Sequence, residues 1–376
     1  MDLVVALHAA AARAGLAAVG FTSAAPFPEA RRDLEDRVAS GRHGGMRFTY
    51  GDPARATDPR ASFPWAGSLV VAAHAYLPVA GNPGPATPGT GRVARFGTED
   101  HYRPLREGLN ALAGALEAAG RRAAVLCDDA RLVDRAAAVR AGVGWWGKNT
   151  MVLAPGYGPW LLLGSVVTDA SLPHDAPMAR ECGTCTSCLP ACPTGALVAS
   201  GVLDARRCLA ALAQSPGTIP REFRRAMGDR LYGCDDCLEA CPPGRRRLDS
   251  GTGTVGAGRV DLLAVLAAEG ATLMRRFAHF YLPKRRARYL QRNALVALGN
   301  AGGKGAVAAA ANCLAGPDPL LRAHAAWALG RLDGPEARAA LRGAAPGESD
   351  PAVAEEIRDA LAGGDGRPGG GDGSVP

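Results

Sequence analysis

The pattern of hydrophobic and polar positions changes character twice along the chain. In the first part, short apolar runs typical of buried strands alternate with stretches in which apolar residues recur at helical spacing. The strands are expected at 68–73 and 161–167, and the helices at 105–119 and 131–141. This part, residues 1–175, is therefore predicted to be an α/β domain.

The middle part, residues 176–255, holds eight of the ten cysteines among Gly, Pro and short helical pieces. It has too few apolar residues to bury a core of its own, so another interaction must hold it together. The composition then shifts to Ala, Leu and Arg.

Residues 256–362 have helical spacing and an internal repeat. The segment Arg292–Gly299 (RNALVALG) is echoed about thirty residues later by Arg322–Gly330 (RAHAAWALG), and a weaker third copy covers 350–361 after an Asp-Pro pair. Helix pairs that recur at such an interval are typical of HEAT-like stacking. We therefore predict an all-α, HEAT-like C-terminal part and a disordered Gly-rich tail over 363–376.

At 376 residues the chain is long enough for two or three domains. No apolar stretch approaches the roughly 20 residues of a membrane span, and residues 1–21 predict an amphipathic helix rather than a signal peptide. We therefore expect a cytoplasmic protein without a membrane partner. The net charge of +7 comes almost entirely from arginine, because Lys148, Lys284 and Lys304 are the only lysines, and it favours a polyanionic partner such as nucleic acid.

The cysteine spacing indicates metal or redox chemistry rather than a disulfide framework. Cys182, Cys185, Cys188 and Cys192, followed by Pro193, form the C-x2-C-x2-C-x3-C-P run of bacterial ferredoxins, and a partial second copy ends at Cys241-Pro242. The fourth cysteine of such a run binds the neighbouring 4Fe-4S cluster. We therefore expect one cluster on Cys182, Cys185, Cys188 and Cys241, and a second on Cys192, Cys208, Cys234 and Cys237.

The alternative is a pair of zinc sites with four cysteines each. Zinc sites rarely use this run, and the partial second copy favours a bacterial-ferredoxin-like dicluster domain over residues 176–255. Cys127 and Cys313 lack ligand spacing, and Cys313 is expected to pack in a core.

These residues resemble the epoxyqueuosine reductases, which complete the queuosine modification of tRNA. The resemblance runs from near the N-terminus to about residue 360, and its most specific part is Gly142–Thr150 (GVGWWGKNT) ahead of the double cluster motif. The other landmarks are Gly44-Gly45-Met46, Asp58-Pro59-Arg60 before Phe63-Pro64, Gly97–Leu105, Gly158–Gly164, Cys182–Cys188, Ala191–Ala196 and Gly233–Cys237.

The resemblance implies a cobalamin-binding α/β domain in which the reduced cobalt removes the epoxide oxygen at the tRNA wobble nucleoside. It places the proton donor at Asp128, in the segment that corresponds to the family's Val-Asp-Thr-Ala-Pro followed by Glu-Arg. It also places Lys148, Asn149 and Thr150 close to the cobalamin. The alternatives are that Asp128 caps a helix beginning near Arg131 and that Lys148–Thr150 forms an ordinary turn.

Four positions depart from the family's pattern. Ala213-Gln214-Ser215 stands for Thr-Ile-Glu, Pro242-Pro243-Gly244 for Pro-Trp-Asn, Ser165 for Glu, and Asp100-His101-Tyr102 for Asp-Tyr-His. The cluster ligands do not depend on these positions, but substrate recognition could.

Three arginine-rich stretches follow the cluster motif, at 221–230, 245–247 and 275–292, the last with interleaved aromatics. They suit an anticodon stem-loop, since arginine pairs with phosphates and stacks on bases; the alternative is a solvated helix face with its aromatics turned inward. Besides tRNA, we expect an external electron donor such as a flavodoxin or ferredoxin, and a monomer. The competing functions are a corrinoid iron-sulfur reductase of a small molecule, similar to reductive dehalogenases, and a ferredoxin-type electron-transfer protein.

Overall fold

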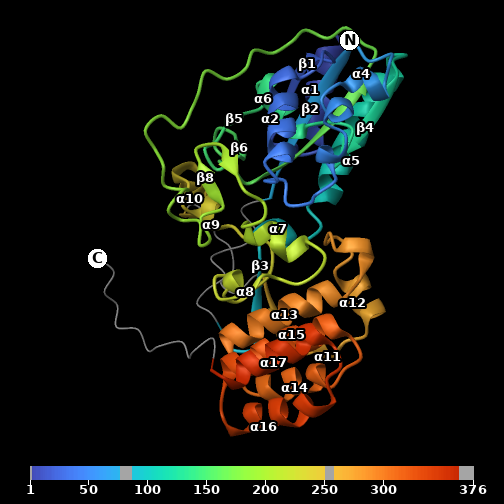
Figure 1. The fold of residues 1–376 in the computed structure, drawn as a ribbon. Coiled ribbons are helices and arrows are strands. Elements are labelled where there is room, and N and C mark those ends of the chain that lie inside the picture. Colours follow the sequence, from blue (N-terminus) through green and yellow to red (C-terminus); the bar gives the residue numbers. More distant parts are fainter. Residues whose placement is uncertain (1, 77–86, 250–257, 364–376) are drawn as a thin grey trace. The chain divides into compact units, whose positions relative to one another are not determined.

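The computed structural model describes residues 2–76, 87–249 and 258–363. The chain divides into two compact units (Figure 1). The first comprises residues 1–82, 98–208 and 235–254, and the second comprises 83–97, 209–234 and 255–376. The predicted boundaries at 175, 255 and 362 separate regions of different composition, and they stay predictions; the predicted tail lies, from residue 364 on, outside the described residues.

The first unit is built on a four-stranded sheet with strand order β1-β2-β7-β4. Its strands are Ala18–Ser23 (β1), Ser68–Ala75 (β2), Leu161–Thr168 (β7) and Ala123–Cys127 (β4), and each neighbouring pair is antiparallel. Strands β2 and β7 are central and buried along most of their length. This explains why they read as continuous apolar runs rather than alternating ones.

Helices cover both faces of this sheet. Alternate residues of β2 pack with Ala137 and Ala138 of α6 (Asp134–Arg140) in one core cluster. On the other face, α5 (Tyr102–Ala118) crosses the sheet at Gly164, where a Cβ atom would lie 2.5 Å from Leu109 Cδ1. The remaining helices of this part are α1 (Leu3–Arg13), α2 (Pro28–Ala39), α3 (Pro53–Ala56) and α4 (Pro59–Ser62).

The cysteine-rich segments of the first unit have little regular structure. They contain the short hairpin of β8 (Leu197–Ala199) and β9 (Val202–Leu203), with the helices α9 (Asp236–Glu239) and α10 (Pro242–Asp249). A second hairpin, β5 (Trp145–Trp146) with β6 (Val152–Leu153), closes around the Gly147–Thr150 turn. A small apolar cluster of Trp145, Leu153 and Cys241 lies in this region.

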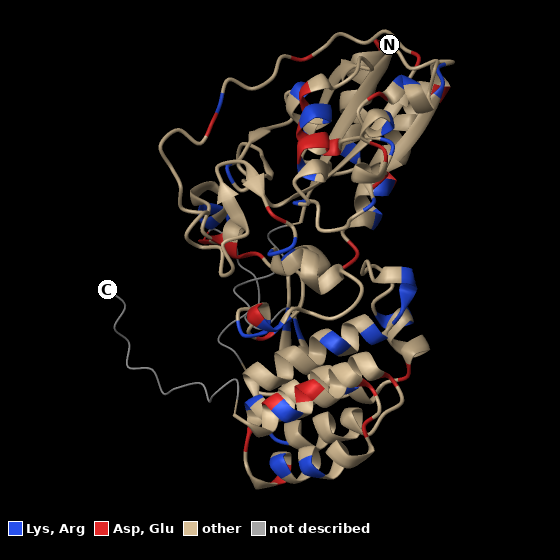
Figure 2. Cartoon of the chain, in the orientation of Figure 1, with Lys and Arg blue, Asp and Glu red and all other residues tan. Residues whose placement is uncertain are grey.

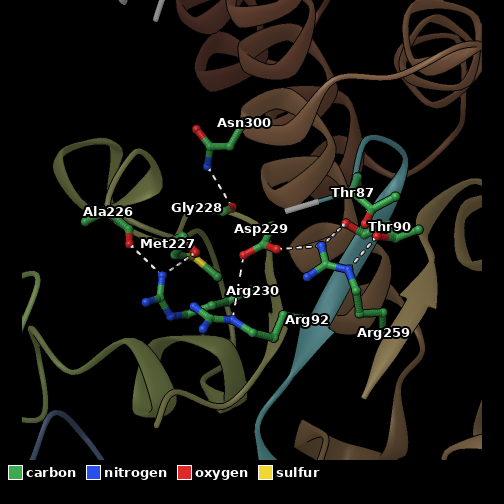
Figure 3. Close-up of polar contacts among 10 residues, drawn as sticks. All are labelled: Thr87, Thr90, Arg92, Ala226, Met227, Gly228, Asp229, Arg230, Arg259 and Asn300. Carbon is green, nitrogen blue, oxygen red and sulfur yellow. Dashed lines mark hydrogen bonds and ion pairs between the residues drawn. The ribbon is translucent and has the colours of Figure 1, made fainter. Parts of the chain in front are cut away.

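The second unit begins with a small sheet of strand order β10-β3-β11, formed by Arg230–Tyr232, Thr90–Val93 and Arg259–Asp261. Figure 3 shows how the loop before β10 is tied down. Asp229 binds Arg259 at 2.6 Å and Arg92 at 3.7 Å, and Asn300 Nδ2 donates to Gly228 O at 3.0 Å. These contacts fix the strand that leads to Cys234.

The helical part of the second unit stacks helices in pairs. The bounds are α11 (Leu262–Ala267), α12 (Gly270–Arg276), α13 (Arg288–Ala301), α14 (Ala306–Leu314), α15 (Pro319–Leu332), α16 (Pro335–Ala344) and α17 (Pro351–Leu361). Helix α15 lies between α13 and α17 (Figure 1). Asp318 and Asp350 each cap the helix that starts at the following proline, with side-chain oxygens that accept backbone N–H groups.

A buried arginine of α13 holds the segment that follows Cys208. That segment contains α7 (Leu209–Gln214) and α8 (Arg221–Arg224). The fully buried guanidinium of Arg292 donates to the carbonyl oxygens of Leu212, Ala213, Ser215 and Gly217. Its neighbour Asn293 donates to Ala213 O at 2.9 Å and to Leu231 O at 3.0 Å. Together they satisfy the carbonyls at the end of α7, which no helical bond would satisfy.

The structure confirms the main predicted elements and corrects two of them. The strands at 68–73 and 161–167 and the three repeat helices are present. The predicted N-terminal helix ends at Arg13, and residues 18–21 belong to β1, which pairs with β2. The helix predicted from residue 131 begins at Asp134, because the Asp129–Arg131 pair closes the preceding turn. Within the described residues no helix is long and apolar enough to cross a membrane.

Replacing Arg292 by methionine should destabilise the second unit by about 3 kcal/mol, because several buried carbonyls lose their donor. The measurement is the free energy of unfolding in denaturant, compared with Arg286→Met. Arg286 is an exposed arginine just before the same helix, so its replacement should change stability by less than about 0.5 kcal/mol. Equal effects of the two substitutions would contradict the assignment of Arg292 as a clamp.

Candidate functional site

The first predicted set of cluster ligands comes together in the first unit. Cys241 lies far along the chain from Cys182, Cys185 and Cys188, yet it is close enough to them for their charges to act on it. Burial raises the pKa of Cys241 to about 11, and the neighbouring thiols add to this shift. Burial likewise raises the pKa of Cys188, with smaller effects from Cys182 and Cys185. Cys241 thus lies close enough to the other three cysteines to interact with them, and their binding of one shared cluster stays a prediction.

Two members of the second predicted set, Cys192 and Cys208, are linked through their neighbours. Ala196 N–H donates to Cys192 Sγ at 3.1 Å, the kind of bond that tunes cluster thiolates. Thr194, two residues after Cys192, donates through Oγ1 to Arg207 O at 2.6 Å, one residue before Cys208. Cys237 belongs to the same unit, whereas Cys234 follows β10 of the second unit.

Within the described ranges, no group of three or more His, Cys, Asp or Glu side chains converges closely enough to hold one metal ion. The thiolates of a 4Fe-4S cluster surround a cube of iron and sulfide, so they stand further apart than the ligands of one zinc ion.

The turn between β5 and β6 binds the cysteine loops directly. Lys148 Nζ donates to Gly183 O at 2.6 Å, between the first two ligands. Asn149 is buried, and its Nδ2 atom donates to Cys237 O at 3.4 Å. Thr150 has a φ of 67°, so the turn is tightly wound. The three residues predicted to lie near cobalamin therefore include two that anchor the cluster ligands, a role that sequence reasoning missed.

Asp128, the predicted proton donor, lies at the end of β4 with a φ of 53°. As a whole residue, Asp128 is exposed. Burial of its carboxyl group nevertheless raises the pKa of Asp128, and the nearby charge of Asp129 raises it further. The positive charge of Arg106 acts in the opposite direction. The alternative role as a helix cap is excluded, since α6 begins at Asp134 and follows Val133.

Asp129 has a different task from its neighbour. Its carboxylate accepts bonds from the backbone N–H of Arg131 and from Arg131 Nε, both at 2.9 Å, and from Nη2 at 2.6 Å. These bonds from Arg131 lower the pKa of Asp129. The two adjacent aspartates therefore differ: one is held ionised and shapes the loop, and the other is held towards its neutral form.

A third carboxyl group, Asp134, was not among the predicted site residues. Its Oδ1 atom is buried and finds no hydrogen-bond partner among the described residues. Burial raises the pKa of Asp134 well above its ordinary value, and the charge of Asp128 raises it further. Burial also raises the pKa of Cys127 to about 12. A sequence signal existed, because Asp134-Arg135 occupies the position of the family's Glu-Arg pair.

Each of the four departures from the family's pattern includes a buried residue. Ser165, His101 and Ala213 are 0%, 6% and 0% exposed. Gly244 is buried, and its carbonyl accepts a bond from Trp160 Nε1 at 3.0 Å. These positions act in packing within the units.

Two family models match the chain. One describes a 4Fe-4S double cluster binding domain and covers residues 181–244, and the other describes HEAT repeats and covers residues 282–362. The chain therefore contains a 4Fe-4S double cluster binding domain and a HEAT-repeat end.

Known proteins identify the family more closely. An epoxyqueuosine reductase of Bacillus cereus is 33% identical over 92% of this chain and 93% of its own length. An epoxyqueuosine reductase with an epoxyqueuosine-modified tRNA-Tyr stem loop superposes with a TM-score of 0.88 at 32% identity, covering 96% of this chain and 98% of that one. A Bacillus subtilis structure, with its catalytic aspartate loop swung out of the active site, gives 0.87 at 31% identity over 96% and 99%. The chain belongs to the epoxyqueuosine reductase family, whose cofactors are 4Fe-4S clusters and cobalamin.

The crossover of ligands predicts how many clusters are lost when two cysteines are replaced together. Cys182→Ser combined with Cys241→Ser should remove one cluster and half of the iron, because both ligands serve the same cluster. Cys182→Ser combined with Cys192→Ser should remove both clusters. Iron and sulfide analysis of anaerobically purified protein measures this, with Cys313→Ser as the control outside both sets. Loss of both clusters in the first pair would refute the crossover.

Proposed function

We propose that this chain reduces epoxyqueuosine to queuosine at the wobble position of tRNA. The observation that supports this most strongly is its end-to-end similarity to an epoxyqueuosine reductase bound to an epoxyqueuosine-modified stem loop. Because the chain spans 98% of that protein, both the cluster region and the helical repeats have counterparts there.

The β5–β6 turn is the proposed cobalamin contact. Trp146 is 47% exposed, and a large exposed ring beside a rigid turn is typical of a surface that meets a ligand. When bound, cobalamin supplies a strongly reducing metal centre for the epoxide. Lys148 and Asn149 bind the turn to the loops of Cys182–Cys185 and Cys237. They would therefore keep the surface that contacts the cofactor in a fixed position relative to the clusters that supply electrons.

Asp128 is the proposed acid that protonates the departing oxygen. Its raised pKa favours the neutral form that a proton donor needs. The loop that carries it runs from β4 to α6, and in the Bacillus subtilis relative the catalytic aspartate loop can leave the active site. In this chain the Asp129–Arg131 bonds fold the loop on itself, so Asp128 would move together with this small clamp.

The proposed RNA contact is the exposed end of the second unit around α12 and the turn Pro283–Arg285. Figure 2 shows lysine and arginine gathered there. Arg275, Arg276 and Lys284 are exposed, and Tyr281 is 63% exposed. The prediction for 275–292 needs one correction, because Phe277, Phe280 and Arg292 are buried and cannot reach a nucleotide. Tyr281 remains as the aromatic face on which a base could stack.

Asp128→Asn should lower the rate of epoxide reduction by about 10²- to 10⁴-fold, because the amide cannot donate a carboxylic proton. Asparagine tolerates the positive φ of this position, so folding and iron content should not change. The assay is the mass of nucleosides released from treated tRNA, in which the product lacks one oxygen. Asp33→Asn, at an exposed aspartate of α2 in the same unit, is the control, and equal losses in both variants would contradict the assignment of the donor.

Arg275→Ala and Arg276→Ala together should weaken tRNA binding and lower the slope of log affinity against log salt by about 2, since each phosphate contact contributes about one unit. Arg342→Ala, an exposed arginine of α16 in the same unit, should leave both quantities unchanged. Binding measured over a series of salt concentrations distinguishes the two. An unchanged slope in the double variant would place the RNA elsewhere.

A further inference from the structure

The proposed reaction has a proton requirement that one carboxyl group cannot meet. Converting an epoxide to an alkene breaks two carbon–oxygen bonds and releases the oxygen as water. The balance is one epoxide, two electrons and two protons giving one alkene and one water. The electrons come from the external one-electron donor through the 4Fe-4S clusters, but Asp128 can hold only one of the two protons.

Asp134 is the group in the same loop that is built to hold another proton. It is the first residue of α6, and Asp128 is the residue that follows β4, so the two flank one short connection. The buried Oδ1 atom of Asp134 has no hydrogen-bond partner within the described part of the chain. A buried carboxylate without a donor is far less stable than a buried neutral acid, and this favours the protonated form.

The neighbouring charges support the same state. The loop contributes Asp128 and Asp129, and α6 contributes the cation Arg135, whose charge opposes theirs. Of the strands packed against α6, β1, β6 and β7 carry no titratable side chain, and β2 carries His74, whose pKa is lowered by burial. Arg106 of α5 acts on Asp128 and on Cys127. When Asp128 loses its proton, its new charge therefore opposes ionisation of Asp134.

A further buried polar group lies on the strand next to β4. Ser165 of β7 is opposite Leu126, two residues before Asp128, and α6 packs against β7. Its Oγ atom is also buried and lacks a partner among the residues described. Buried polar atoms of this kind commonly bind an ordered water, which can carry a proton.

We propose that Asp134 stores the second proton of the reaction and passes it to Asp128 after Asp128 has protonated the epoxide oxygen. This inference rests on the proposed function. In the first step, the proton of Asp128 moves to the oxygen as the first carbon–oxygen bond breaks. Asp134 then returns Asp128 to its neutral form, and Asp128 delivers the second proton as the oxygen leaves as water. Because Asp134 acts through Asp128, it is a positioning residue for the proton and does not touch the substrate.

The protonation state can be measured without the reaction. We would record the infrared C=O band of neutral carboxylic acids in the cluster-containing protein at about pH 8, where exposed carboxyl groups are ionised. The wild-type protein should show the bands of two neutral acids, Asp134→Asn should lose the one that Asp128→Asn keeps, and the double variant should show neither. If Asp134→Asn keeps both bands of the wild-type protein, Asp134 is not the stored acid and the proposal is overturned.

The kinetic test uses epoxide reduction in single turnovers as a function of pH. Asp134→Asn should be about 10-fold or more slower than wild type near pH 8, and the deficit should shrink near pH 6, where solvent can refill Asp128 directly. Asp134→Glu should restore most of the rate at both values, and Asp33→Asn, at an exposed aspartate of α2, should behave as wild type. A deficit of Asp134→Asn that does not change with pH would show a merely structural role and overturn the proposal.

The pH dependence of the free energy of unfolding gives a third test of the stored proton. The folded state holds the Asp134 proton more tightly than the unfolded chain, so wild-type stability falls as the pH rises from the unfolded pKa towards the folded one. Asp134→Asn has no such proton and should lose less stability between about pH 5 and pH 8; an equal loss would count against the stored proton. A wild-type protein that shows the infrared bands but leaves the epoxide intact would instead refute the proposed function alone.

Discussion

The gathering of cysteine thiols in a partly buried place is the constraint on which this part of the first unit depends. Cys241 is brought to the loop of Cys182, Cys185 and Cys188, where burial opposes the ionisation of Cys241 and Cys188 and the charges of neighbouring thiols add to this effect. Thiolates can gather in such a place only when positive iron compensates them. The loops around these cysteines are tied down by Lys148, Asn149 and Thr194.

In the second unit, a buried arginine holds the segment between Cys208 and Cys234. Arg292 is buried with a pKa lowered to about 9 by the loss of water, which is costly for a cation. The cost is offset by bonds to four carbonyl oxygens in the segment between Cys208 and Cys234. The helical repeats thus hold the cluster-bearing segment in place, in addition to the role in RNA contact suggested by their exposed residues. This explains why an arginine sits in the apolar face of α13.

The sequence predicted the features that follow from the spacing of neighbouring residues, and it missed those that arise from contacts with distant elements. The cluster ligands, the central strands and the repeat helices follow from local patterns, because ferredoxin spacing and helical periodicity are written in neighbouring residues. Residues 18–21 were assigned to a helix because their strand character comes from pairing with β2. The burial of Arg292 and of Asp134 Oδ1 could not be predicted, since it arises from elements distant in sequence. The selection of Lys148 and Asn149 as cofactor contacts stays a prediction, and their bonds to the cysteine loops were seen only in the structure.

The Asp-Pro starts of α15 and α17 have a consequence for how such a protein changes over time. Each of these helices brings its own cap and its own fixed first φ angle. The start of the helix is therefore encoded within the repeat and does not rely on the repeat before it. A segment with this property can be duplicated or deleted as a block, so the length of the helical end is free to vary while the iron-sulfur chemistry upstream is left intact.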